Sequence, residues 1–298
     1  MSKQILFIVG CLLLSLSLQA QDDVPILLTK TYKKVKYAPE QGARYSKVEA
    51  TKSLGPEGVL KLSGKATARL YCNGTFKELK GKGTHPVASL FEDELRYAPM
   101  GFSSTFNSRL MAAIGGPKGS DTTSISSGWG NKKFEIISST PIGKVVAGQL
   151  ITFRWQSKKD LPEYTFSLED ESGKVVHSAA VKKKEYMLNL GELGLKEGKK
   201  YAWKVVETGG AAFSNKYFFS IARDAEKAEV MKLLQEEEVY QQADPLMKKL
   251  MEAVSFEDAE FYYAADKAYA EAAGMSDTGN LPQEMREALT RKQARAQD

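Results

Sequence analysis

Cysteine and histidine are scarce in this sequence of 298 residues, which contains two of each. If the apolar N-terminal stretch with Cys11 is removed on export, Cys72 is the one cysteine left, and no intrachain disulfide can form. His85 and His177 are far apart, and neither has a second histidine or a cysteine at the spacing of a metal site. The composition therefore argues against a disulfide scaffold and against a zinc site built from one short segment.

Catalytic signatures are also missing. The sequence has no Gly-x-Ser-x-Gly, no His-Glu-x-x-His and no glycine-rich phosphate loop before Lys-Ser or Lys-Thr. Acidic residues cluster at 22–23, 169–171 and 236–238, but without the alternating ligands of a calcium loop, so solvated turns are the simpler interpretation. We expect a non-enzymatic protein with no catalytic residue, no cofactor and no metal. A hydrolase whose carboxylates come from distant segments stays open as an alternative.

A long apolar run is found at the N-terminus. Lys3 precedes mostly apolar residues from Ile5 to Leu18, and Ala20 precedes the polar Gln21. One positive charge, a short apolar core and a small residue predict a signal peptide over residues 1–20. The run is shorter than the ~20 residues of a membrane-spanning helix. We expect an exported protein, periplasmic or associated with the periplasmic face of the outer membrane, with no transmembrane segment after cleavage.

Charge is unevenly distributed along the chain. Residues 21–222 carry 31 Lys and Arg against 20 Asp and Glu, whereas residues 223–298 carry 10 against 17. Lys33, Lys34 and Lys36 form a basic run that is a candidate contact for an anionic partner, although such a run is more often a solvated strand face or a protected edge. Nucleic acid is not an expected partner, because the sequence has no recognisable nucleic-acid-binding module.

Residues 21–114 are predicted to form a small β-domain that ends in two or three turns of helix over residues 106–114. A strand is predicted at 59–62, and Asn73-Gly74 predicts a tight hairpin because both residues tolerate positive φ. The residues expected to face inward before this turn are Ala66, Ala68, Leu70 and Cys72, so the thiol should be buried and inert.

This succession of glycines and alternating apolar positions, from Gly58 to Gly83, resembles the FecR-type periplasmic domain of bacterial envelope proteins. The resemblance implies a small β-domain used as a scaffold or signalling platform, with no catalytic residues. The chain lacks the cytoplasmic helix and second membrane span of the sensor members, which puts direct transmembrane signalling in doubt.

Residues 115–132 are rich in Gly, Ser and Thr, a composition that predicts a flexible linker. Trp129 stands out within it, either as a binding aromatic or as a residue that packs against the next domain.

Residues 133–222 alternate large apolar and polar residues in segments separated by turn formers, a pattern typical of a β-sandwich. Leu195-x-x-Gly198-x-x-Tyr201-x-Trp203 resembles the fibronectin type III and wider immunoglobulin-like pattern. The resemblance implies that the Tyr201 hydroxyl ties a corner of the fold. We expect a shared interior to hold Phe153, Trp155, Tyr201 and Trp203.

From Arg223 the apolar period changes from two to 3.6, which predicts a helical segment over residues 223–298. Helix starts are predicted near Asp224, Asp244, Ser255 and Leu281. The succession of short helices with small and aromatic residues resembles a tetratricopeptide-like hairpin, although the consensus spacing is not met.

Together these patterns predict a mainly β protein with an α-helical C-terminal region. We expect a scaffold or adaptor that binds an envelope protein partner through its helical tail or an exposed sheet edge. The alternative is a module that binds carbohydrate or peptidoglycan through Trp129, Tyr71 or the basic face.

Overall fold

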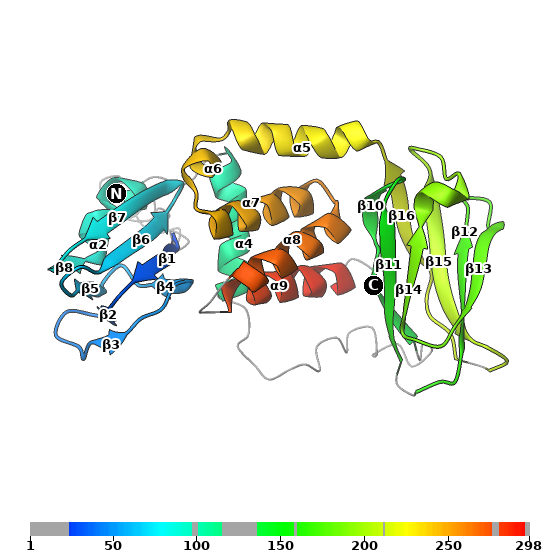
Figure 1. Cartoon of the computed structure of the whole chain (residues 1–298), viewed down its shortest axis with the longest axis horizontal. Helices are drawn as coiled ribbons and strands as arrows, with labels where there is room; N and C mark the ends of the chain where they lie inside the picture. The colour runs from blue at the N-terminus through cyan, green and yellow to red at the C-terminus, as the bar shows by residue number, and fades with distance from the viewer. Residues whose placement is uncertain are drawn as a thin grey trace, which may run out of the picture. The chain divides into compact units, whose positions relative to one another are not determined.

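The computed structural model describes residues 24–96, 101–114, 136–157, 160–210, 212–275 and 280–295 (Figure 1). The predicted signal peptide, the predicted linker and Trp129 lie outside these residues. Contacts divide the chain into two compact units: residues 1–48 and 53–99 belong to unit 1, and residues 49–52 and 100–298 belong to unit 2. None of the helices in the described ranges is long and apolar enough to cross a membrane.

Unit 1 consists of two four-stranded sheets followed by two short helices. The first sheet has the order β4–β1–β6–β7, with β1 Ile26–Tyr32, β4 Lys52–Leu54, β6 Thr67–Cys72 and β7 Thr75–Lys80. The second has the order β3–β2–β5–β8, with β2 Val35–Ala38, β3 Ser46–Lys47, β5 Val59–Leu62 and β8 Gly83–Pro86. The helices are α2 Val87–Leu90 and α3 Glu92–Arg96.

The core of unit 1 confirms the predicted alternation. The residues at 0% exposure include Ala66, Ala68, Leu70 and Cys72, which pack with Ile26, Leu28 and Phe91. Asn73 (φ 46°) and Gly74 (φ 88°) form the predicted two-residue turn, with Cys72 opposite Thr75.

Tyr71 is also fully buried, so its interpretation as a glycan-binding aromatic is wrong. Alternation places its side chain on the opposite face of β6 from Cys72, but that face is covered too, and the Tyr71 and Phe76 ring centroids are 5.2 Å apart.

Unit 2 contains a β-sandwich of a five-stranded and a three-stranded sheet. The larger sheet has the order β10–β16–β15–β12–β13, with β10 Gly143–Val146, β12 Tyr164–Glu169, β13 Val175–Val181, β15 Lys200–Glu207 and β16 Tyr217–Ala222. The smaller has the order β14–β11–β9, with β9 Ile136–Thr140, β11 Leu150–Ser157 and β14 Glu185–Asn189. A 3₁₀ turn, η2, covers Leu190–Leu193.

The interior of the sandwich is aromatic, as predicted. The four residues Phe153, Trp155, Tyr201 and Trp203 are each 6% exposed or less, and the Phe153 and Trp203 ring centroids are 5.1 Å apart in an edge-on arrangement. The Tyr201 hydroxyl accepts a hydrogen bond from the Lys196 backbone N–H at 2.9 Å. The predicted corner is therefore present, and this part of the chain is an immunoglobulin-like sandwich.

The helices of unit 2 are α4 Gly101–Ile114, α5 Asp224–Glu236, α6 Glu238–Gln242, α7 Pro245–Asp258, α8 Tyr262–Met275 and α9 Leu281–Arg295. Helix α4 packs against α7 and α9 although it precedes the sandwich in the chain. Its fully buried residues are Phe106 and Leu110. This grouping differs from the predicted domain boundary at residue 114.

The predicted helix start at Asp244 is confirmed, because its carboxylate accepts a hydrogen bond from the Met247 backbone N–H at 3.0 Å. The predicted start at Ser255 is wrong: Ser255 lies inside α7, whose buried face continues through Phe256 and Glu257. The chain breaks instead at Glu260, which has a φ of 65°.

A buried carboxylate joins four of these helices. Glu257 of α7 is 3% exposed and lies 2.9 Å from Arg109 Nε of α4 and 3.1 Å from Lys292 Nζ of α9. It also accepts a hydrogen bond at 3.2 Å from the hydroxyl of Tyr269 in α8. Burial, together with the Glu257 charge, raises the pKa of Tyr269 well above its usual value, so the hydroxyl stays a donor. The ion pairs satisfy a charge that would be costly if left alone.

Backbone contacts dock the helices on the sandwich. The Lys144 N–H, in edge strand β10, donates to the Glu260 carbonyl between α7 and α8 at 2.8 Å. The Thr152 N–H, in β11, donates to the Tyr263 hydroxyl of α8 at 3.1 Å. The first bond occupies a strand donor that would otherwise face an open edge, because β10 is the outermost strand of its sheet.

Gly143 makes the first of these contacts possible. Its φ is +74°, and a Cβ atom at this position would lie 2.4 Å from the Glu260 carbonyl oxygen and 2.6 Å from the Tyr262 ring. Glycine is therefore required both by the left-handed backbone and by the close approach of the helices.

We predict that Gly143→Ala destabilises unit 2 more than Gly173→Ala does. Gly173 has a similar φ of +83°, and an added Cβ would have no atom within 4 Å. Gly173→Ala therefore measures the cost of the left-handed backbone without any steric clash, about 1–2 kcal/mol. Gly143→Ala should cost more in urea unfolding and should remove hydrogen-exchange protection at Lys144. Equal costs for the two variants would show that the helices do not depend on this contact.

Candidate functional site

Three lysines lie side by side on the β3–β2–β5–β8 sheet of unit 1. Lys36 in β2 is opposite Lys47 in β3 on one side and opposite Lys61 in β5 on the other. These three residues, the basic row, lie on the face opposite the buried Val35 and Leu62. Like charges at directly opposed positions repel each other, so the row destabilises the free sheet.

The basic row has few counter-charges. Lys47 has an interaction partner of its own. In the described part of the chain, no carboxylate lies within 4 Å of the Lys36 or Lys61 ammonium group. Lys61 Nζ instead lies 5.4 Å from the centroid of the Tyr45 ring, within the range of a cation–π contact. The face therefore keeps a positive charge that an anionic partner can neutralise.

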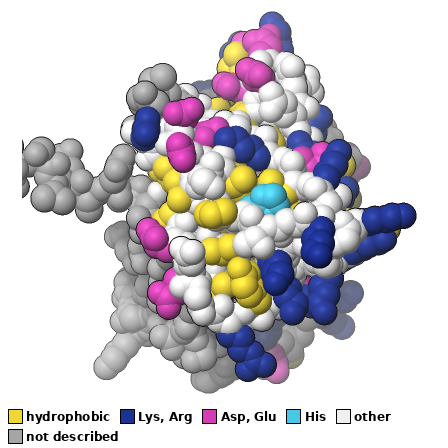
Figure 2. Space-filling view, turned by 90° about the vertical axis from the view of Figure 1, so that its left-hand side faces the viewer, with side chains coloured by type: hydrophobic (Ala, Val, Ile, Leu, Met, Phe, Trp, Pro, Cys, Tyr) yellow, Lys and Arg dark blue, Asp and Glu magenta, His cyan; other side chains and the backbone are white. Residues whose placement is uncertain are grey.

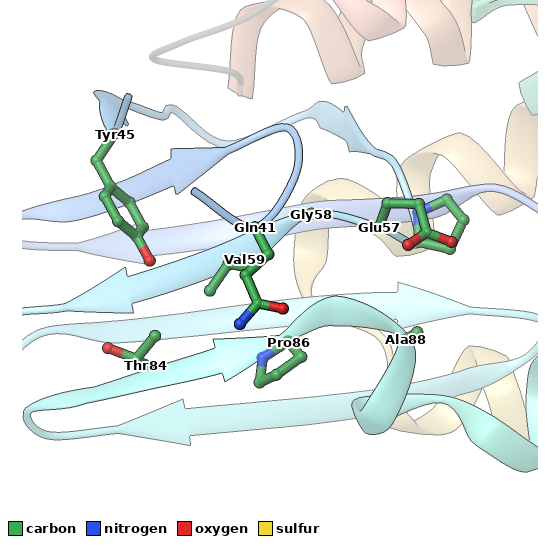
Figure 3. A pocket seen from close by; sticks show the side chains of 9 residues that line it. Gln41, Tyr45, Glu57, Gly58, Val59, Thr84, Pro86 and Ala88 are labelled. Atoms are coloured by element: carbon green, nitrogen blue, oxygen red, sulfur yellow. The ribbon is translucent and has the colours of Figure 1, made fainter. Parts of the chain in front are cut away.

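A cleft of about 270 Å³ adjoins the basic row on the same face. Next to the row, Val59 of β5 lies opposite Ala38 of β2 and Pro86 of β8. Pro86 is exposed, whereas Ala38 and Val59 are 1% and 7% exposed. Figure 3 shows the side chains around Val59 that line the cleft, which include those of Gln41, Tyr45, Thr84 and Pro86.

The chemistry of this cleft suits binding. Tyr45 offers an aromatic face, Gln41 an amide and Thr84 a hydroxyl, and Glu57 is the one carboxylate in the lining, which contains no histidine or cysteine. Paired carboxylates or a nucleophile with a base would be needed for hydrolysis. The Tyr45 ring, the exposed Pro86 and the adjacent cations fit a ligand that carries negative charge.

Lys36, one of the three predicted contact lysines, belongs to the basic row. Lys33 lies in the turn after β1, with a φ of 62° and its ammonium group 5.4 Å from the centroid of the Tyr32 ring. Lys34 follows in the same turn, where its carbonyl accepts a hydrogen bond from the Ser63 hydroxyl at 3.0 Å. Trp129 is not among the described residues.

Lys47 and Lys61 were not predicted as contacts. Each is an isolated lysine in its own segment, and only the strand register brings them beside Lys36. Figure 2 shows one face of this unit, where Lys and Arg side chains gather along one side next to exposed hydrophobic side chains.

The acidic cluster at 169–171 is engaged by the protein itself. Glu169 is 4% exposed and lies 2.7 Å from Lys204 Nζ, and hydrogen bonds from Lys204 and Lys216 lower its pKa. Asp170 accepts hydrogen bonds within its own turn, and Glu171 accepts one from the Lys200 backbone N–H. Within the described ranges, no group of three or more His, Cys, Asp or Glu side chains is arranged to hold a metal ion.

Comparisons with known proteins identify no family. No family model matches the chain. No curated protein matches it.

Several solved structures are similar to part of the chain. CopC from Methylosinus trichosporium OB3b is 20% identical over 30% of this chain and 95% of its own, with a TM-score of 0.23. The fibronectin(III)-like modules of Clostridium thermocellum CbhA are 14% identical over 30% and 96%, with a TM-score of 0.21. The adhesin domain of Epf from Streptococcus pyogenes is 10% identical over 67% and 66%, with a TM-score of 0.24.

We predict that Lys61→Gln stabilises unit 1, because it removes repulsion from Lys36. The expected gain in unfolding free energy is about 0.2–1 kcal/mol at low salt, and it should shrink as salt screens the charges. Lys65→Gln, in the exposed turn before β6, is the control and should change little. A loss of stability in Lys61→Gln at low salt would contradict the repulsion.

We also predict that Cys72 is unreactive in the folded protein. Burial, followed by the nearby Glu94 charge, raises its pKa to about 12, so almost no thiolate exists at pH 8. In a Cys11→Ser variant, a thiol reagent should label Cys72 rapidly in urea and very slowly without it. Because the folded pKa is raised, the contribution of this group to stability should fall as the pH rises from about 8.5 to about 12. Rapid labelling of the native protein would disprove the burial.

Proposed function

We propose that this protein is a non-enzymatic scaffold or adaptor that acts outside the cytoplasm. In this proposal the basic row and the adjoining cleft hold an extended acidic segment of a protein partner. The observation that carries it is the row of three lysines at directly opposed strand positions, two of them without a carboxylate nearby. Their repulsion is relieved when negative charge is bound.

The cleft supplies the anchoring part of the proposed interface. A volume of about 270 Å³ accommodates an anchoring side chain of a peptide, with Tyr45 and Val59 as its apolar walls. Acidic side chains on either side of that anchor would then reach Lys36 and Lys61. Buried apolar contact would supply affinity, and the lysines would select for charge.

The location outside the cytoplasm is part of the proposal. It is supported by the pattern of a positive charge, a short apolar run and a small residue over 1–20, and by the resemblance of residues 58–83 to the FecR-type domain. The helical segment 223–298 and the sheet edges of the sandwich would be the sites where an adaptor takes a second partner.

The proposal is tested with a fluorescent ten-residue peptide that alternates Glu and Val. We predict that the wild-type protein binds it and that Lys36→Glu combined with Lys61→Glu weakens binding at least tenfold, measured by anisotropy at constant salt. Raising the salt should weaken wild-type binding as well, because the attraction is between exposed charges.

Lys65→Glu provides a control with the same kind of charge change outside the row, and it should bind nearly as well as the wild type. Polygalacturonate, an anionic glycan, forms the second arm of the experiment. Binding of the glycan but not of the peptide, with loss in the double variant, would replace the protein partner by a carbohydrate. Equal weakening by Lys65→Glu would rule out the basic row as the interface.

A further inference from the structure

The five-stranded sheet of unit 2 has two edges, and the described residues cover only one of them. At the β10 edge, the Lys144 N–H donates to the Glu260 carbonyl at 2.8 Å. Strand β13 forms the other edge and pairs with β12 alone. Figure 1 shows β13 on the side of the sandwich away from the helices. The backbone groups on its open side can therefore pair with another extended chain.

The strand register shows which backbone groups of β13 face the open side. In an antiparallel ladder, alternate residues bond to the neighbouring strand, and those between them point the other way. The Glu163 carbonyl bonds to the chain just after β15, so Phe166, three residues on, bonds toward its β13 partner, Ala179. Ser178 and Ala180, on either side of Ala179, therefore direct their N–H and carbonyl groups away from β12.

The regular part of β13, from His177 to Val181, lacks the usual protection of a sheet edge. It contains no proline and no Lys, Arg, Asp or Glu. Ser178 and Ala180 are exposed, and their small side chains allow another backbone to approach closely. Their outward N–H and carbonyl groups have no backbone partner among the described residues. The edge thus offers two donors and two acceptors in the arrangement that a strand requires.

Lysines at the end of β13 favour one kind of occupant. Lys182 and Lys183 are exposed and have no carboxylate within 4 Å in the part of the chain that the structure describes. Lys184, in contrast, pairs with Asp160 at 2.6 Å. The turn beside the open edge therefore keeps two positive charges, which favour an extended segment that ends in acidic residues.

A second copy of this chain fits the same edge less well. Symmetric antiparallel pairing about Ser178 would place Lys174 of one copy opposite Lys182 of the other. Symmetric pairing about Ala179 would place Lys174 opposite Lys184 instead. Like charges at opposed positions destabilise a strand pair, so both registers disfavour self-association.

We propose that the open edge of β13 binds an extended segment of a protein partner, flanked by acidic residues, which adds a strand to the five-stranded sheet. Main-chain hydrogen bonds with Ser178 and Ala180 hold the segment, and Lys182 and Lys183 select for its acidic end. This inference rests on the proposed adaptor function and specifies the edge at which the sandwich takes the second partner.

The test uses a peptide in which Val and Thr alternate between two glutamates at each end. The ¹⁵N-labelled full chain carries Lys36→Glu and Lys61→Glu, which remove binding at the basic row, so that the two proposals fail separately. Peptide binding should slow hydrogen exchange of the Ser178 and Ala180 N–H groups at least tenfold. The same peptide with methylated backbone nitrogens should not bind, because it has no N–H to donate.

Ala180→Pro removes an outward donor without breaking a bond to β12, and it should raise the Kd of the peptide at least tenfold. Ala180→Ser keeps the donor and should bind like the starting chain. Lys182→Glu combined with Lys183→Glu should also weaken binding. Lys196→Glu combined with Lys232→Glu makes the same charge change at exposed positions elsewhere in unit 2 and should bind more tightly than that variant.

Unchanged hydrogen exchange at Ser178 and Ala180 in excess peptide would overturn the proposal, and so would equal binding of the methylated peptide. Exchange at these two residues that slows with protein concentration, without peptide, would identify a second copy as the occupant and overturn the assignment of a partner. None of these results bears on the basic row, because that site is disabled in the chain used.

Discussion

The hydrogen bond between the Lys144 N–H and the Glu260 carbonyl joins the helices of unit 2 to the sandwich at an exposed strand edge. Strand β10 pairs with β16 along one side and would otherwise leave its other side open to another chain. The bond requires a close approach of two backbones, and Gly143 permits it because it has no Cβ. The left-handed turn at Glu260, which separates α7 from α8, aims the carbonyl at the strand. Gly143 and the break between α7 and α8 at Glu260 thus allow the helical segment to cover the edge of the sheet at β10.

Charged groups in this protein fall into two kinds. Buried carboxylates are fully engaged: Glu257 contacts groups on three other helices, and Glu169 lies beneath two lysines. These groups hold elements together, and a ligand would have to break those bonds to reach them. In contrast, Lys36 and Lys61 have no carboxylate nearby among the described residues, and Lys61 lies opposite Thr84, which lines a cleft. Positive charge without a nearby carboxylate, next to a cleft, therefore distinguishes the basic row, which we propose as a binding surface, from the charged groups that stabilise the fold.

The sequence predicted the features that depend on neighbouring residues. The Asn73-Gly74 hairpin and the Tyr201 corner were foreseeable because each is made within a few residues of chain. Of the three lysines in the basic row, only Lys36 was predicted as a contact. Strand register places Lys47 and Lys61 beside it, and the local sequence does not specify that register. The helix start at Ser255 failed because the buried stripe of α7 continues past a local capping pattern. The prediction that Tyr71 is an exposed binding aromatic was wrong. Alternation predicts on which face of the strand a side chain lies, but it does not predict whether other residues cover that face.

Helix α4 precedes the sandwich in the sequence but packs against α7 and α9, which follow the sandwich. A fragment that ends at residue 222 would leave Phe106 and Leu110 of α4 uncovered, since their packing surface lies on α7 and α9. A fragment that begins at residue 133 would strip the Arg109 partner from buried Glu257. Excision of this unit for separate study therefore has to keep residues 101–295 in one piece, because α4 and the helices it packs against lie on opposite sides of the sandwich in the chain.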